Sequence, residues 1–162
     1  MLEVKVYSFE EMLKEKGFLV YTNVGVSMMP FLRERRDIIE IRRKDPVTRC
    51  KKYDVVLYKC SDKYILHRIL AVRLHDYVIC GDHNIRREFG ITDDMILGVM
   101  TRVIRGGKSI YPTDWKYRLY VHLFCDFFPI RAAILFAKKL TAAILRRVKK
   151  TKEKGVDREG NE

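Results

Sequence analysis

The chain has 162 residues, of which 48% are hydrophobic and 33% charged, and its formal net charge is +12. This length fits one domain, and nine Tyr and eight Phe are too many aromatic residues for a disordered chain. The four cysteines, at positions 50, 60, 80 and 125, form no CxxC pair, which argues against a zinc site or a redox motif. Four cysteines in a chain of this length also do not suggest a disulfide framework, so we expect mostly buried thiols in a reducing compartment.

A short N-terminal helix is marked at both ends. Ser8 and Glu11 form a capping box, and Gly17 is placed to end the helix. Phe18–Val24 then has the apolar and aromatic composition of a strand. The next segment, Ser27–Arg36, has helix-compatible composition with a proline near its start.

Residues 37–110 have the composition of β-structure. β-branched and aromatic residues gather in short segments separated by charged or glycine-bearing breaks, which indicates a small, coiled antiparallel sheet or barrel. The predicted strands are Asp37–Arg43, Tyr53–Lys59, Tyr64–Leu74, Tyr77–Cys80 and Met95–Arg105.

After Pro112 the pattern becomes helical. Helices are predicted at Trp115–Phe128 and Ile130–Lys149, with a break at Pro129, before a polar tail expected to be disordered. This gives a mainly β domain at 1–112, a helical extension at 113–150 and a tail at 151–162. Neither a secretion signal nor an apolar span of about 20 residues is visible, so we expect a cytoplasmic protein or one peripheral to the cytoplasmic membrane.

The first segment with chemical potential is Gly25-Val26-Ser27-Met28-Met29-Pro30. Ser27 follows a predicted strand and precedes a predicted helix start, where backbone N–H groups can point at a developing negative charge. Gly25 allows a substrate to approach the backbone closely. The same serine also fits the simpler role of a helix N-cap.

The second segment is Ile65-Leu66-His67-Arg68-Ile69. Strand alternation places Ile65, His67 and Ile69 on one face and Leu66 and Arg68 on the other. His67 is either a hydrogen-bonded core histidine or a general base, whose ordinary pKa suits proton transfer from a hydroxyl group near neutral pH.

The third segment is Gly81-Asp82-His83-Asn84, followed by Glu88. Either carboxylate could hold an imidazole in one tautomer and stabilise its charged form. An ordinary β-turn explains the same residues, and a metal site at Asp82 and His83 lacks a second spaced pair of ligands.

In order and spacing, the three segments resemble the boxes of the signal peptidase and LexA-like superfamily, whose nucleophile box is roughly G-x-S-M-x-P. The resemblance covers about residues 20–105, and the histidine in the base position is similar to the Ser–His branch of archaeal and endoplasmic-reticulum signal peptidases. It implies that Ser27 is the nucleophile and His67 the base. Asp82 and Glu88 are both candidates to orient His67, and the choice between them stays open.

The resemblance further implies a serine endopeptidase, as in signal peptide processing, with the family's small coiled sheet. It would cleave an extended peptide or protein segment, with Gly25 and Met28 in the substrate and oxyanion region and with no metal or cofactor. The chain departs from the family in showing neither an N-terminal membrane anchor nor a DNA-binding domain. Some signal peptidases carry a serine where this chain has Gly25, so backbone N–H groups would have to hold the oxyanion.

A catalytically silent module that binds peptides or membrane surfaces is the alternative. The predicted C-terminal helices carry aromatic residues ahead of a basic run, a combination that suits an anionic bilayer surface, although packing of the aromatic residues onto the sheet is the simpler explanation. Nucleic acid is a less suitable partner, because no recognised nucleic-acid-binding motif accompanies the charge. The aromatic residues are Trp115, Tyr117, Tyr120, Phe124, Phe127 and Phe128, and the basic run is Lys138, Lys139, Arg146, Arg147, Lys149, Lys150, Lys152 and Lys154.

Overall fold

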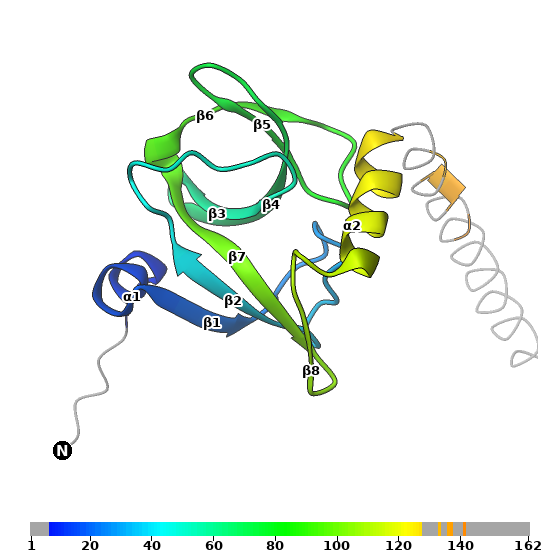
Figure 1. Cartoon of the computed structure of the whole chain (residues 1–162), viewed down its shortest axis with the longest axis horizontal. Coiled ribbons are helices and arrows are strands. Elements are labelled where there is room, and N and C mark those ends of the chain that lie inside the picture. Colours follow the sequence, from blue (N-terminus) through cyan, green and yellow to red (C-terminus); the bar gives the residue numbers. More distant parts are fainter. Residues whose placement is uncertain (1–6, 128–132, 134–135, 138–140, 142–162) are drawn as a thin grey trace, which may run out of the picture.

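The structure, a computed structural model, describes residues 7–127, 133, 136–137 and 141. Its described part is mainly β, with an eight-stranded antiparallel sheet and two α-helices (Figure 1). The predicted tail at 151–162, and all but four positions of the predicted helix Ile130–Lys149, lie outside the described residues. Among the described residues, no helix is long and apolar enough to span a membrane.

The N-terminal helix α1 (Phe9–Lys16) is confirmed with both of its predicted caps. The Ser8 hydroxyl accepts from the Glu11 backbone N–H at 3.2 Å, and the Glu11 carboxylate accepts from the Ser8 N–H at 2.7 Å. Gly17 ends the helix in the left-handed region, at φ +75°. These contacts satisfy backbone groups that the helix ends leave without intrahelical partners.

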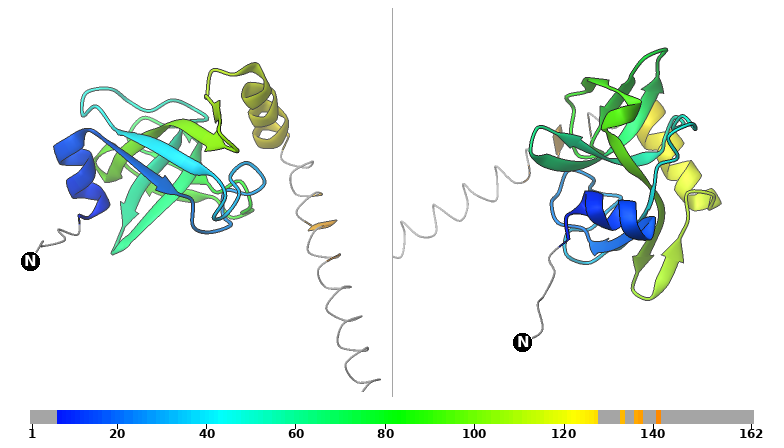
Figure 2. Two further views of the ribbon diagram at one scale, coloured as in Figure 1. Left: turned by 90° about the horizontal axis from the view of Figure 1, so that it is seen from below. Right: turned by 90° about the vertical axis from the view of Figure 1, so that its left-hand side faces the viewer.

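The sheet has the strand order β1-β2-β7-β3-β4-β5-β6, with β8 paired to β7. Strand β7 therefore joins a β1–β2 half to a β3–β6 half, and the sheet is strongly curved (Figure 2). The strands are β1 (Phe18–Thr22), β2 (Ile38–Arg43), β3 (Val55–Cys60), β4 (Lys63–Val72), β5 (Tyr77–Cys80), β6 (Glu88–Ile91), β7 (Ile96–Arg105) and β8 (Lys108–Ile110).

The helix prediction for Ser27–Arg36 is wrong, because this segment forms turns. Its backbone is held by contacts that a helix would not make: the Arg33 N–H donates to the buried Asp37 carboxylate at 2.8 Å, and the Arg35 N–H donates to the Asn23 carbonyl at 2.8 Å. The Arg105 guanidinium binds both the Asp37 carboxylate and a carbonyl within the segment. The β1–β2 connection is thus fixed by tertiary hydrogen bonds.

The hairpin of β3 and β4 separates two hydrophobic cores. Alternate residues of β3 face opposite sides, so Val55 and Leu57 pack in the first core and Val56 and Tyr58 in the second. The same alternation along β4 places Leu66 in the first core and Ile69 in the second, as predicted. Burial on both faces explains why β3 begins as a continuous apolar run.

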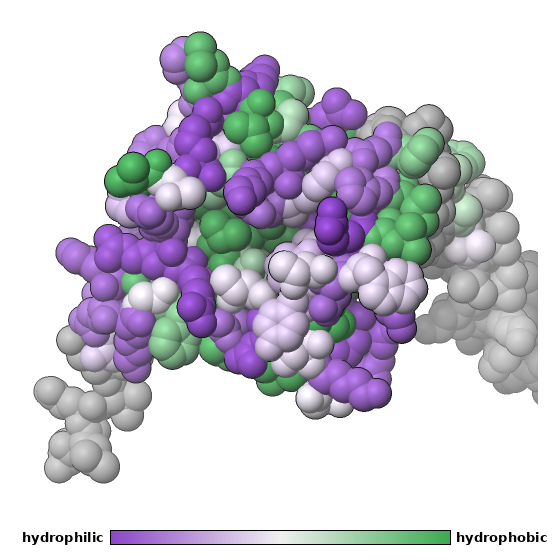
Figure 3. Space-filling model, in the orientation of Figure 1, coloured by the Kyte–Doolittle hydropathy of each residue, from purple (hydrophilic) through white to green (hydrophobic). Residues whose placement is uncertain are grey.

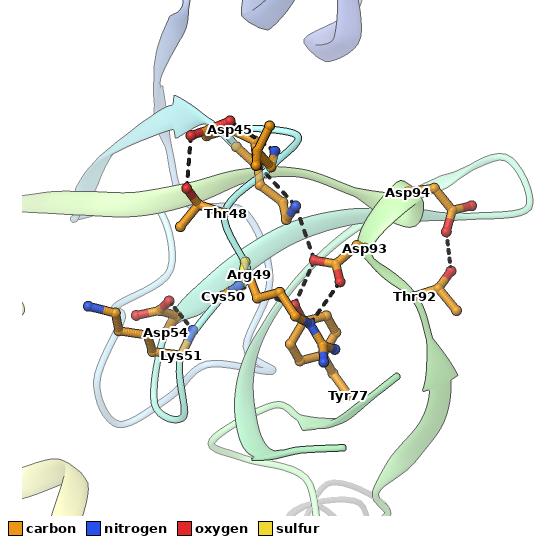
Figure 4. A network of polar contacts seen from close by, with 12 residues as sticks. Asp45, Thr48, Arg49, Cys50, Lys51, Asp54, Tyr77, Thr92, Asp93 and Asp94 are labelled. Carbon is orange, nitrogen blue, oxygen red and sulfur yellow. Dashed lines mark hydrogen bonds and ion pairs between the residues drawn. The ribbon is translucent and has the colours of Figure 1, made fainter. Parts of the chain in front are cut away.

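A polar network fastens the long loop between β2 and β3 to the second core (Figure 4). Asp93 lies at its centre, with Lys44 Nζ and Arg49 Nε each 3.0 Å from one of its oxygens and the Tyr77 hydroxyl donating at 2.6 Å. Burial would raise the pKa of Asp93, but the Tyr77 hydrogen bond and the two cations hold it below its usual value. We infer that this network stabilises the fold by holding the β2–β3 loop in place.

The C-terminal helix α2 (Trp115–Val121) continues as a π-helical turn (His122–Asp126), close to the predicted span. Figures 1 and 2 place α1 and α2 at opposite ends of the sheet. The four cysteines all lie among the described residues, and none of them forms a disulfide bond there.

Candidate active site

Ser27 lies in the turn that follows β1, next to a buried anchor. Gly25 adopts φ +112°, a conformation that L side chains rarely adopt, and this opens the turn. Met28 is 1% exposed and packs in the first core, so its predicted place in the substrate region can involve its backbone but not its side chain. The partly exposed Ser27 is thus held on a loop whose next residue is fixed by packing.

His67 lies in the middle of β4 and contacts Glu88 and Tyr58. Its Nδ1 is 2.8 Å from Glu88 Oε1 and 3.2 Å from the Tyr58 hydroxyl oxygen. The Tyr58 hydroxyl donates to the other Glu88 oxygen, Oε2, at 2.6 Å. His67 is buried and Glu88 is half-buried, so these contacts form in a partly desolvated environment.

Strand register explains how residues so far apart in sequence meet. Val56 pairs with His67, so Tyr58, two residues along β3, lies diagonally opposite His67 on the same face. Glu88 begins β6 and pairs with Ile79 of β5, which in turn pairs with Ile69 of β4. All these side chains face the second core.

This arrangement assigns the proton of neutral His67 to Nδ1. Burial, reinforced by the Glu88 carboxylate, raises the pKa of Tyr58, so its phenol keeps its proton and donates to Glu88. The Glu88 carboxylate can only accept, so the proton between it and His67 belongs to Nδ1. The other ring nitrogen, Nε2, is then the one that can accept a proton.

Gly81 lies where Ser27 and His67 approach each other. A Cβ atom at position 81 would be 2.6 Å from the Ser27 carbonyl oxygen and 2.8 Å from His67 Nε2. Both atoms therefore border one small space, which only glycine leaves open. The His83 N–H donates to the same Ser27 carbonyl at 2.7 Å, which ties the loop after β5 to the serine turn.

The two candidate carboxylates have different partners. Glu88 contacts His67, whereas Asp82 forms a bidentate ion pair with Arg68. Arg68 Nε lies 2.9 Å from Asp82 Oδ1, and Arg68 Nη2 lies 2.7 Å from Asp82 Oδ2. Asp82 and Arg68 are both 0% exposed, and the pair also contacts Tyr117 and Tyr120 of α2. The sequence leaves both carboxylates as candidates to orient the base, and the geometry favours Glu88.

A groove of about 360 Å³ opens beside Ser27. Its walls come from α1, β1 and the β3–β4 hairpin, and they are mainly apolar and aromatic. The Phe9 ring lies 5.2 Å from the Tyr21 ring and 5.1 Å from the Tyr64 ring, measured between centroids. The lining residues are Phe9, Tyr21, Asn23, Val24, Ser27, Leu57, Tyr64, Ile65 and Leu66.

Sequence reasoning missed Tyr58 and the aromatic wall of this groove. Tyr58 shares the alternation of Val56 on β3, but only the pairing register shows that it faces His67. Within the described part of the chain, no group of three or more His, Cys, Asp or Glu side chains is placed to bind a metal ion, and this part includes Asp82 and His83. Comparisons of the chain with models of known protein families, with curated proteins and with solved structures found no match.

Proposed function

We propose that the protein is a serine endopeptidase with Ser27 as nucleophile, His67 as general base and Glu88 as the residue that orients His67. The observation that carries this proposal is the hydrogen bond from His67 Nδ1 to Glu88, which leaves Nε2 on the side of the ring that borders the Ser27 turn across Gly81. A base held by a carboxylate beside a serine is the arrangement that activates a hydroxyl nucleophile.

Acyl transfer follows from these positions. His67 Nε2 takes the Ser27 hydroxyl proton as Oγ bonds to the peptide carbonyl carbon, and Glu88 stabilises the imidazolium ion. Backbone N–H groups near Ser27 and Met28 hold the oxyanion. The imidazolium then gives its proton to the departing amine as the C–N bond breaks. Water, deprotonated by His67, cleaves the acyl ester, and Ser27 recovers its proton.

The substrate fits as an extended strand. Among the described strands, β1 pairs only with β2, so its other edge is open. Strand β5 pairs with β4 only from Arg68 to Val72, so within the described part of the chain the same edge of β4 is also open at Lys63–Leu66. The groove beside Ser27 lies between these two segments. A peptide added along either edge would form backbone hydrogen bonds and place apolar side chains in the groove.

A diverse mixture of synthetic peptides, incubated with the full chain and analysed by mass spectrometry, tests the proposal even though the substrate is unidentified. We expect new peptide termini, and we expect their formation to stop in Ser27→Ala and in His67→Ala. The exposed Ser109→Ala and His75→Ala variants are matched controls and should cleave normally. Cleavage that survives Ser27→Ala would refute the assignment, and peptide binding without cleavage would favour the silent binding module.

A further inference from the structure

The outer side of α2 and its π-helical turn carries an exposed apolar row. Trp115, Leu119, Leu123 and Phe127 recur at intervals of four residues and are 69%, 51%, 49% and 55% exposed. Figure 3 shows hydrophobic side chains gathered over α2 at the edge of the molecule. Isolated exposed apolar residues are ordinary, but a continuous row along one side of a helix indicates a contact surface.

The opposite side of the same helix is fixed to the sheet, so the row faces outward. Tyr117 and Val121 pack in the first core, and the Tyr120 ring stacks on Phe124. Tyr117 and Phe124 are therefore not available to a membrane, contrary to one of the sequence hypotheses, whereas Trp115 and Phe127 are exposed. Phe128 lies outside the described residues.

Further polar contacts hold this orientation. The Tyr117 hydroxyl accepts from Arg68 Nη1 at 2.6 Å. In the π-helical turn, the Asp126 carboxylate accepts from the Tyr53 hydroxyl at 2.6 Å and pairs with Lys52 at 3.0 Å. These contacts fix which side of the helix faces the sheet, and turning the row inward would break them.

The charges around the row indicate what covers it. Lys116 and Arg118 are exposed on the same helix, and eight Lys and Arg residues fall between positions 138 and 154. These like charges oppose covering of the row by a second copy or by the basic segment of the same chain. A tryptophan and aliphatic residues flanked by cations are typical of a helix lying in the interface of an anionic bilayer.

We propose that the apolar row of Trp115, Leu119, Leu123 and Phe127 inserts into the interface of an anionic lipid bilayer. The helix would lie along the surface, with its apolar row among the acyl chains and its cations at the headgroups. The catalytic groove would then be carried at a membrane surface, although this binding does not depend on the peptidase activity.

Trp115 makes a direct test available because it is the only tryptophan in the chain. The full chain is titrated with vesicles of phosphatidylcholine containing about 30% phosphatidylglycerol, or of phosphatidylcholine alone, and tryptophan emission is recorded. We expect a blue shift and quenching by brominated acyl chains, with weaker binding to neutral vesicles and at high salt.

The double variant Leu119→Ser/Leu123→Ser keeps the reporter and should weaken partitioning about tenfold or more, because two apolar side chains no longer leave water. Val47→Ser/Leu74→Ser removes two highly exposed apolar residues from loops of the sheet and should bind as the unchanged chain does. The proposal is overturned if emission does not respond to anionic vesicles, if the Leu119/Leu123 variant binds undiminished, or if a blue shift depends on protein concentration without lipid, which would indicate a second copy.

Discussion

Replacing Asp82 with asparagine removes the charge that neutralises a fully buried guanidinium group. Asp82 and Arg68 are both 0% exposed, and two hydrogen bonds join them. Burial alone would lower the pKa of Arg68, but the Asp82 carboxylate more than offsets burial and raises the pKa well above its ordinary value. A guanidinium group keeps its proton in proteins even when it is buried, so Arg68 stays charged in Asp82→Asn although its charged partner has been removed.

The expected loss in the free energy of unfolding is about 3–5 kcal/mol, the usual cost of removing one partner of a buried pair. For a domain of this size the midpoint of thermal unfolding should fall by roughly 10 °C. Urea titration followed by far-UV circular dichroism gives the free energy and shows whether the slope is unchanged. Arg68→Met/Asp82→Leu, which removes both charges, should recover part of the loss.

An exposed ion pair provides the matched control. Glu10 and Lys59 are 2.7 Å apart and both partly exposed, so Glu10→Gln should leave the unfolding curve almost unchanged. A loss below about 1 kcal/mol in Asp82→Asn would refute the reasoning, because it would mean that Arg68 is solvated or finds another counter-charge.

Three further variants test the site and its support. Tyr58→Phe removes the 2.6 Å hydrogen bond to Glu88. If the proposed peptidase activity is found, this variant should lower kcat about tenfold with little change in KM on the cleaved peptide, and an unaltered kcat would exclude Tyr58 from positioning the proposed base. Gly81→Ala places a Cβ atom 2.8 Å from His67 Nε2 and should reduce kcat/KM about 100-fold in a chain that still folds by circular dichroism; full activity would mean that the two loops separate without cost. Burial would raise the pKa of Asp37, but its arginine partner holds it below the usual value, so its contribution to stability is complete above about pH 4 and is lost as the pH falls through the lowered folded-state pKa. Asp37→Asn should therefore lower the free energy of unfolding at pH 7. It should also reduce the loss of that free energy as the pH falls, as measured by urea titrations at several pH values, and an unchanged pH dependence would contradict this assignment.

Local signals in the sequence predict most of the fold. The caps of α1 depend only on residues within the helix and at its ends, and β5 is predicted with its observed bounds because its four apolar residues are followed by glycine. Strands β6 and β8 are missed. Strand β6 contains Gly90 at φ +74°, and β8 has only three residues, so neither has a clear strand pattern in its own sequence. Both form because they pair with a neighbouring strand.

The site shows the same division between local and tertiary information. The order of the three segments is enough to propose Ser27, His67 and the two carboxylates as candidates. The choice of Glu88 over Asp82 depends on how β4, β5 and β6 align and on the partner that Arg68 finds, and neither is visible in single segments. The helix prediction at 27–36 is wrong for the same reason, because Asp37 and Arg105 determine the path of this turn.

The position of β7 in the sheet has a consequence for synthesis of the protein. The chain leaves the ribosome from its N-terminus, so Ser27, His67 and Glu88 all emerge before β7 is complete. Yet β7 is the strand that joins the half carrying Ser27 to the half carrying His67 and Glu88. A nascent chain thus contains all three residues before the strand that joins the two halves has formed, and we expect any activity that needs them to appear only after residue 105 has entered the sheet.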